Sequence, residues 1–193
     1  LSPITREGGY YVQEQSGELP AAFRLRISAA GIVDVVGAQR QAVSYKVVRK
    51  VKAGSEAEAQ RLLDNAKLIA ARQGDTVTMR IDKPGCWNCG FHSELHVQAP
   101  YATREATISS MGGEIHVANI EGRIIADSSA GAIRAENIGG GVRADTAGGP
   151  ITLGDIGGPV RCDTAGGRIQ VGSVRGDAIL STSGGGIEVG DVQ

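Results

Sequence analysis

The chain is poor in aromatic residues, in charge of one sign and in long apolar runs. Only seven of its 193 residues are aromatic, and none lies beyond Tyr101. Basic and acidic side chains number 20 and 21, so there is no basic excess to neutralise a phosphate backbone. No stretch approaches the ~18 consecutive apolar residues of a membrane-spanning helix. These shortages argue against nucleic-acid binding and against a membrane span in this sequence.

Cysteine is also scarce, and two of the three cysteines lie close together. Cys86 and Cys89 enclose Trp87 and Asn88, and His92 and His96 follow. The pair is compatible with a disulfide, with two free thiols, or with a zinc site completed by the two histidines. We favour the disulfide, because His96 sits in an alternating strand pattern that turns it away from the core. A thioredoxin-like redox role lacks the βαβ context that it needs, and we expect no cofactor and no metal.

Glycine is abundant, at 29 residues, and it marks an internal repeat of 18 residues. Apolar residues two positions apart follow each glycine, which places their side chains on one face of a short strand. Such a face cannot be buried by one strand, so successive units must stack on one another. The first apolar register of the repeat consists of Ile115, Ile133, Ile151, Ile169 and Ile187.

The repeat predicts a mainly β fold, a β-solenoid or single-stranded β-helix with 18-residue coils, over residues 102–193. We expect the glycines at its corners to supply positive φ angles. Residues 1–101 form a β-rich region that is either separate or an irregular start of the same solenoid. The Ca-binding nonapeptide roll, the acyltransferase hexapeptide helix and the pectin-lyase helix each require a pattern or a catalytic loop that this repeat lacks. The sequence therefore predicts no enzyme.

The N-terminal region contains six predicted strands and one predicted helix. Ser55 and Glu58 form a capping box, an apolar stripe follows, and Gly74 supplies a stop, so we expect a helix near residues 55–73 that covers one side or end of a sheet. A helical insertion unrelated to such a role is the alternative. The strands are expected at residues 10–13, 23–28, 32–36, 43–51, 76–81 and 95–98.

These motifs together resemble the bacterial putative-adhesin domains, a family of Gly-rich β-strand-repeat proteins. The resemblance rests on Gly31-Ile-Val-Asp-Val-Val-Gly37, on a strand that ends in Pro100, and on repeats such as Ala144-Asp-Thr-Ala-Gly-Gly149. It implies an extracytoplasmic protein, in the periplasm or on the cell surface of a bacterium, with no catalytic residues to carry over. The Cys-Trp-Asn-Cys segment departs from the family's usual pattern.

Two places in the sequence are candidates for binding. Trp87 lies on an expected loop, where an exposed aromatic ring can stack on a sugar or anchor a partner; packing over the neighbouring sheet is the alternative. The second candidate is a face with Arg143 and Arg161 two residues before Asp145 and Asp163, which could bind cations or acidic glycans. Its alternative is structural, with the aspartate and threonine side chains accepting hydrogen bonds from turn amides.

The function expected from these observations is contact with a cell-envelope protein or glycan through a polar surface, without catalysis. An alternative function is a structural scaffold that stacks end to end, or another homo-association, because the last unit, residues 185–193, carries no capping sequence. Any export or anchor sequence is expected upstream of Leu1.

Overall fold

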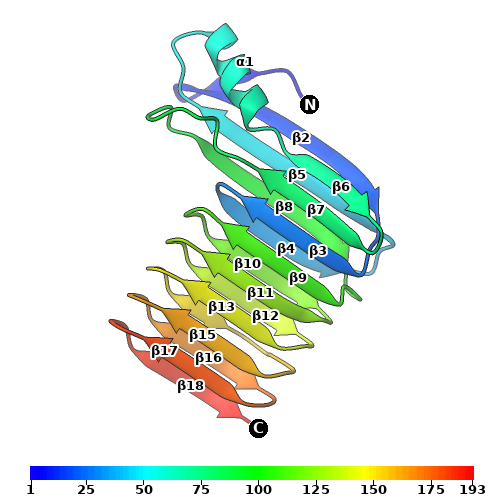
Figure 1. Ribbon diagram of the computed structural model, residues 1–193, viewed down its shortest axis with the longest axis vertical. Helices are drawn as coiled ribbons and strands as arrows, with labels where there is room; N and C mark the ends of the chain where they lie inside the picture. Colours follow the sequence, from blue (N-terminus) through cyan, green and yellow to red (C-terminus); the bar gives the residue numbers. More distant parts are fainter.

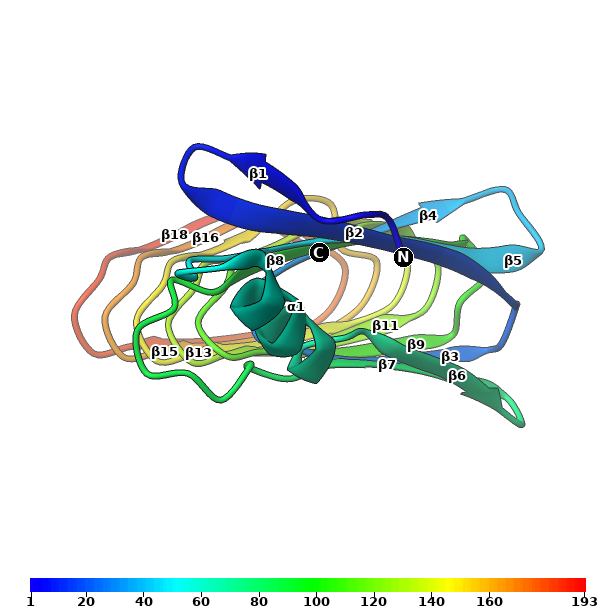
Figure 2. The same cartoon turned by 90° about the horizontal axis from the view of Figure 1, so that it is seen from above.

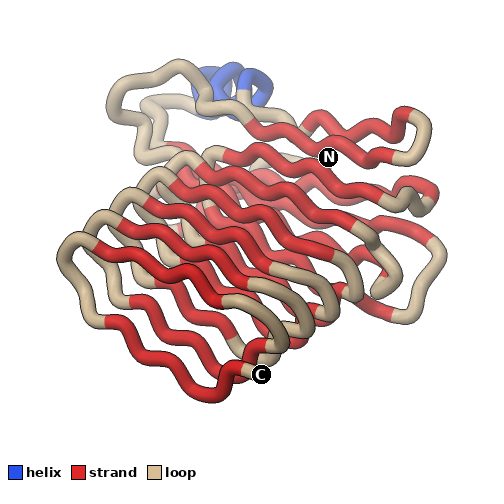
Figure 3. The backbone as a smooth tube through the Cα atoms, turned by 60° about the horizontal axis from the view of Figure 1, so that its bottom comes forward, coloured by secondary structure: helices blue, strands red, loops and turns tan.

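The computed structural model describes all residues 1–193 as two large β-sheets lying face to face, with one helix (Figures 1 and 3). Sheet A has ten strands, which are, in spatial order, β1 (Thr5–Glu7), β2 (Tyr10–Pro20), β5 (Ala42–Val51), β8 (His92–Pro100), β4 (Ile32–Ala38), β10 (Ile115–Ile120), β12 (Ile133–Ile138), β14 (Ile151–Leu153), β16 (Ile169–Val174) and β18 (Ile187–Val192). Sheet B has eight, which are β17 (Ala178–Thr182), β15 (Val160–Thr164), β13 (Val142–Thr146), β11 (Arg123–Ser128), β9 (Glu105–Ser110), β3 (Arg24–Ala29), β7 (Thr76–Ile81) and β6 (Ile69–Gln73).

The expected fold class, a β-solenoid or single-stranded β-helix, is wrong. Both sheets are mixed: β2 runs antiparallel to β1 and β5, β5 runs antiparallel to β8, and β6 runs antiparallel to β7. Strands that reverse direction within one sheet do not arise from a chain that winds in a single sense. The 18-residue period instead sets the register of parallel pairing from β10 onward, so that Ile115 lies opposite Ile133 and Ile124 opposite Val142.

All six strands predicted in residues 1–101 are present, as β2, β3, β4, β5, β7 and β8. Two of them lie inside the sheets rather than at one end. β3 lies between β7 and β9, and β4 lies between β8 and β10. Residues far apart in the sequence therefore become neighbours around β4, which matters for the polar groups described below.

The core lies between the two sheets and is built from the alternating apolar positions of the strands. A single cluster of 34 buried residues runs through it. In the first isoleucine register of the repeat, the first four members are fully buried, but Ile187 on the outermost strand of sheet A is 44% exposed. Its predicted burial is wrong because no further strand pairs with β18 on its other side.

Glycine at the corners is required by close packing rather than by positive φ. Gly131, Gly149 and Gly167 have no left-handed φ, yet a Cβ atom on any of them would collide with the backbone carbonyl of the equivalent glycine one unit earlier. Gly112, with φ of 98°, does adopt the conformation expected of a corner glycine. The expectation of positive φ at these corners thus holds for Gly112 and fails for the stacked column.

Hydroxyl side chains, rather than aspartates, cap these corners. The Thr146 hydroxyl donates to the Gly131 carbonyl at 3.0 Å and accepts from the Gly149 amide at 3.3 Å. Thr164 makes the same two contacts one unit later, with Gly149 and Gly167. Each hydroxyl joins two successive units, which satisfies backbone groups that would otherwise be buried without partners.

The helix α1 (Glu56–Asn65) begins where the capping box predicted. The Ser55 hydroxyl accepts from the Glu58 amide at 3.2 Å, and the Glu58 carboxylate accepts from the Gly54 amide rather than from that of Ser55. Viewed from above, α1 lies across the end of the molecule between the planes of the two sheets (Figure 2). Ala59 and Leu63 are its buried residues, and they pack with Val51. The expectation that the helix covers an end of the sheets is confirmed.

The helix is shorter than the predicted 55–73. Its last turn is capped by Arg49 on β5, whose guanidinium donates to the Leu63 and Ala66 carbonyls at 2.8 and 3.1 Å. After this cap the chain enters β6, where Ile69 pairs with Arg80 of β7. The predicted end at Gly74 is wrong because residues 69–73 pair with β7 as an edge strand of sheet B, and Gly74, with φ of 60°, lies in the turn between β6 and β7.

Candidate functional site

A loop between β7 and β8 holds Trp87 on the surface. Cys86 and Cys89 are joined by a disulfide with a Cα–Cα distance of 5.7 Å, and Gly90 adopts a φ of 53° directly after it. Cys89 is 9% exposed and packs with Val51 and with the buried side of α1. Trp87 itself is fully exposed. The loop is therefore anchored to the helix on one side and presents its indole ring to solvent on the other.

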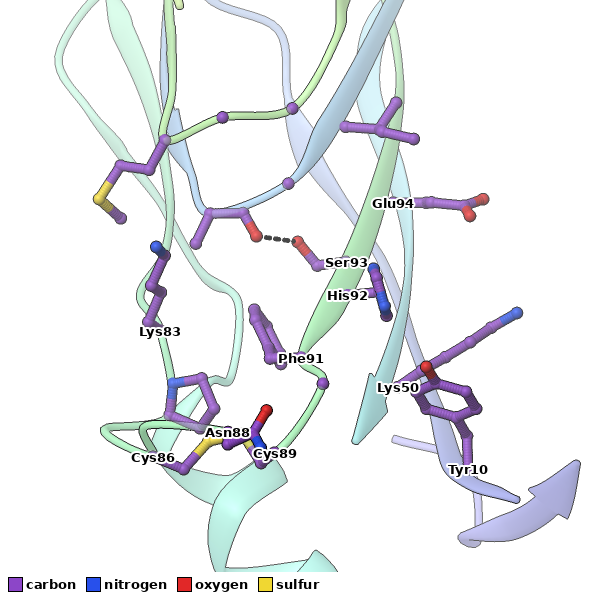
Figure 4. A pocket seen from close by; sticks show the side chains of 18 of the residues that line it. Tyr10, Lys50, Lys83, Cys86, Asn88, Cys89, Phe91, His92, Ser93 and Glu94 are labelled. Carbon is purple, nitrogen blue, oxygen red and sulfur yellow. Dashed lines mark hydrogen bonds between the residues drawn. A yellow bond between two sulfur atoms is a disulfide. The ribbon is translucent and has the colours of Figure 1, made fainter. Parts of the chain in front are cut away.

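A pocket of about 880 Å³ lies beside this loop (Figure 4). Its apolar wall includes Phe91 and Met111, and its polar groups include Lys83, Asn88 and Glu94. It opens at the corner where β3 passes into β4 and β9 into β10. The pocket combines an exposed aromatic ring with hydrogen-bond donors and acceptors, including one positively and one negatively charged side chain.

Aromatic and basic groups border the pocket on the side of β2. The rings of Tyr10 and His92 meet edge to face with their centroids 5.8 Å apart, and the Lys52 ammonium lies 5.0 Å from the centre of the Tyr10 ring. Ser93 is fixed by a hydrogen bond of 2.9 Å to the Ala30 carbonyl (Figure 4). These contacts hold the Tyr10 ring and the Ser93 hydroxyl in place, which lowers the side-chain entropy lost when a ligand binds.

The second predicted site lies on the outer face of sheet B. Arg143 and Asp145 on β13 pair in register with Arg161 and Asp163 on β15. The Arg143 Nε donates to Asp145 at 2.8 Å, and this hydrogen bond, with the charge of Asp145, raises the pKa of the exposed Arg143. None of these four residues lines the pocket beside Trp87. The structure thus places the predicted contact residues on two separate surfaces.

The four residues of the zinc alternative do not converge. The sulfurs of Cys86 and Cys89 are bonded to each other, and His92 packs on Tyr10. His96 instead places its Nδ1 at 3.1 Å from a carboxylate oxygen of Asp34. The third cysteine, Cys162, is buried in the core, and this burial raises the pKa of its thiol to about 12.

A polar row on the outer face of sheet A was not expected from the sequence. It joins His96 on β8, Asp34 on β4 and His116 on β10. Asp34 is 62 residues before His96 and 82 before His116, so no local spacing links the three. The strand order β8-β4-β10 creates the contact.

The outermost strand of sheet A, β18, is the edge at which end-to-end stacking is expected. Val189 and Val192 on β18 are 45% and 47% exposed and, with Ile187, line a shallow hollow of about 560 Å³. End-to-end stacking stays a prediction for light scattering to test. No helix of the protein is long and apolar enough to cross a bilayer.

Solved structures with similar folds come from bacteria. A putative cell adhesion protein from Clostridium sporogenes superposes with a TM-score of 0.58 over 94% of this chain and 100% of its own, at 8% identity. A putative adhesin from Bacteroides fragilis covers 94% of this chain and 95% of its own with a TM-score of 0.43 at 9% identity. A putative lipid binding protein from Parabacteroides distasonis covers 94% and 97%, with a TM-score of 0.38 at 12% identity. No family model and no curated protein matches the sequence. At such identities the likeness to the Clostridium protein concerns the fold alone.

Proposed function

We propose that this chain is a non-enzymatic, adhesin-like protein of the bacterial cell envelope that binds a glycan outside the cytoplasm through the pocket beside Trp87. Membership of the putative-adhesin family is supported by the motifs around Gly31, Pro100 and Gly149 and by the shared fold of the Clostridium protein. The extracytoplasmic location follows from that membership. It is supported further by the Cys86–Cys89 disulfide, since disulfides persist mainly in oxidising compartments.

The observation that carries the proposal is the full exposure of Trp87 on a loop that is fixed at both ends. A ligand that covers a tryptophan ring removes about 150–250 Å² of apolar surface from water, and Trp87 is fully available for such a contact. The disulfide and the packing of Cys89 hold the loop that carries it. The full exposure of Trp87 argues against the alternative in which it packs over the neighbouring sheet.

A sugar ring matches this surface better than an apolar ligand does. The C–H face of a pyranose can stack on the indole of Trp87, while its hydroxyls both donate and accept hydrogen bonds. The pocket offers donors on Lys83 and Asn88 and an acceptor on Glu94. The face with Arg143 and Arg161 is a separate, polar surface that could add contacts with an acidic part of a longer glycan.

Trp87 is the only tryptophan, so its fluorescence reports directly on this site. Titration with a panel of soluble bacterial and host oligosaccharides should shift or quench the emission for the ligands that bind. The Trp87→Ala variant should lose at least tenfold in affinity for the same ligands, measured by calorimetry. Phe23→Ala is the matched control, because it removes another exposed aromatic ring, which lies just before β3 at the end of that strand opposite the pocket; it should bind as the parent does.

Two results would refute the proposed binding sites, and they differ in what they say about a binding function. Glycan binding that survives both Trp87→Ala and the double substitution Arg143→Ala, Arg161→Ala would refute these sites but not a binding function. Absence of fluorescence change across the panel, together with unchanged emission on adding envelope proteins, would refute the proposed role of Trp87.

A further inference from the structure

All three histidines of the chain lie on the outer face of sheet A, and two of them contact one carboxylate. Asp34 lies opposite His96 on one neighbouring strand and opposite His116 on the other. One carboxylate oxygen of Asp34 is 3.1 Å from His96 Nδ1 and the other is 2.7 Å from His116 Nδ1. Asp34 accepts both hydrogen bonds when each imidazole carries its proton on Nδ1.

His116 has a second carboxylate at its other nitrogen. Its Nε2 is 3.3 Å from Oε1 of Glu136, which lies on β12. A neutral imidazole has one donor and one acceptor nitrogen, so a His116 that donates from Nδ1 to Asp34 turns a lone pair from Nε2 toward Glu136. Two acceptors then face each other. This contact becomes favourable only when Nε2 carries a proton, or when a cationic group of a ligand beside the two atoms donates to both of them.

The surroundings favour a cation at this point. The nearest basic side chains are already paired: Arg134 with Glu114 at 3.3 Å, and Lys46 with Glu14 at 3.0 Å. Glu94, the remaining acidic group near His96, is in no ion pair and adds negative charge to the face. A hollow of about 710 Å³ contains Asp34, His116 and Glu136, and it continues across β14 and β16 past Thr152 and Gln170. A chain of several residues can therefore lie across the strands.

We propose that His116 Nε2 and Glu136 form a binding site for the ammonium group of a lysine in a basic segment of a partner protein, and that a proton competes for the same place. The ammonium has three donors, so it can donate to Nε2 and to the Glu136 carboxylate together. Acidification places a proton on Nε2, the imidazolium then donates to both carboxylates, and the ligand is displaced. The site is separate from the pocket beside Trp87 and does not depend on glycan binding there.

Imidazole ¹⁵N chemical shifts test the premise, because they identify which ring nitrogen carries the proton. At pH 8 His116 should be protonated at Nδ1 alone, and adding an octalysine peptide should shift its Nε2 resonance. Peptide affinity should fall by about tenfold for each pH unit once His116 is mostly protonated, since one proton replaces one ammonium. A proton found on Nε2 at pH 8 without peptide would overturn the proposal.

Matched variants test the assignment in the same experiment. Glu136→Gln should weaken octalysine binding at pH 7.5 at least fivefold, and His116→Gln should remove the pH dependence between pH 7.5 and 5.5. His92→Gln, on the same face but outside the row, should retain both the affinity and the pH dependence. The inference fails if Glu136→Gln binds as tightly as the parent, or if the pH dependence survives His116→Gln. The side chains are partly exposed, so the variants are expected to fold.

Discussion

Replacing Arg49 by methionine tests how the helix is fixed to the sheets. Arg49 is fully buried, and its guanidinium donates to the carbonyls of Leu63 and Ala66 and to the side-chain oxygen of Gln13, the last at 3.1 Å. Burial away from water lowers the pKa of Arg49, which shows that the charge is held there at a cost. Its Nε has no hydrogen-bond partner, so the three hydrogen bonds and the negative charge of Asp64 are the compensation that the structure offers.

Methionine keeps much of the side-chain volume but leaves the Ala66 carbonyl and the Gln13 side-chain oxygen without donors, while the Leu63 carbonyl keeps the Ala66 amide at 3.2 Å. At about 1 kcal/mol for each unsatisfied acceptor, Arg49→Met should lower the free energy of unfolding by about 2 kcal/mol. For a domain of this size that corresponds to a fall in Tm of about 4–8 °C. Urea unfolding followed by far-UV circular dichroism should show a lower midpoint at an unchanged slope. Amide exchange should be fastest in α1, whose last carbonyls lose their cap.

Arg61→Met is the matched control, because Arg61 lies on the exposed side of the same helix. Its substitution should change the stability by less than about 0.5 kcal/mol. An Arg49→Met protein as stable as the parent, or more stable, would refute the reasoning. The cost of burying the guanidinium would then exceed the value of its three bonds, as it does for some buried ion pairs.

Two further predictions concern the repeat. Gly131→Ala should destabilise the protein by more than about 3 kcal/mol or prevent folding, because its Cβ would collide with the backbone of Gly113. Gly148→Ala should be tolerated, since its Cβ would lie 3.8 Å from the Ala130 carbonyl oxygen. Equal stabilities of the two variants in urea would contradict this account. Burial raises the pKa of Cys162 from 9.0 to about 12, so above pH 9 the unfolded chain loses this proton before the folded one does. Between pH 9 and 12 the free energy of unfolding should therefore fall by about 1.4 kcal/mol per pH unit because of this thiol. Urea unfolding at a series of alkaline pH values should show that Cys162→Ala loses this pH dependence. The same pH dependence in the parent and the variant would show that the thiol is not protected.

Local patterns in the sequence predicted the elements that local interactions determine. The alternation of apolar and polar residues identified the strands, and the Ser55–Glu58 spacing identified the start of α1. The 18-residue period predicted the parallel register from β10 onward but led to the wrong fold class. The period describes neighbours within residues 102–193 and carries no information on the antiparallel pairing of β2 with β5, because both strands lie before the repeat.

The sites were predictable to different degrees for the same reason. The loop position of Trp87 was predicted because the loop is defined by adjacent residues, whereas its role in binding stays a proposal. The row of Asp34, His96 and His116 was missed, since it depends on which strands lie beside β4. Arg49 did leave a signal: it occupies the inward register between Val47 and Val51, where a charged residue requires buried acceptors. The helix that supplies them follows directly in the sequence.

The position of β3 and β4 inside the sheets also constrains the order in which the chain can fold as it is synthesised. Both strands emerge early, yet their neighbours in the finished sheets, β7 and β9 for β3 and β8 and β10 for β4, begin 47 or more residues later. Until then each is an apolar strand with two open edges, the kind of segment that pairs with other chains. Because the chain is made from its N-terminus, β3 and β4 can pair wrongly during the whole time in which the segment from β5 to β7 is synthesised. A factor that binds extended apolar segments would act in that interval.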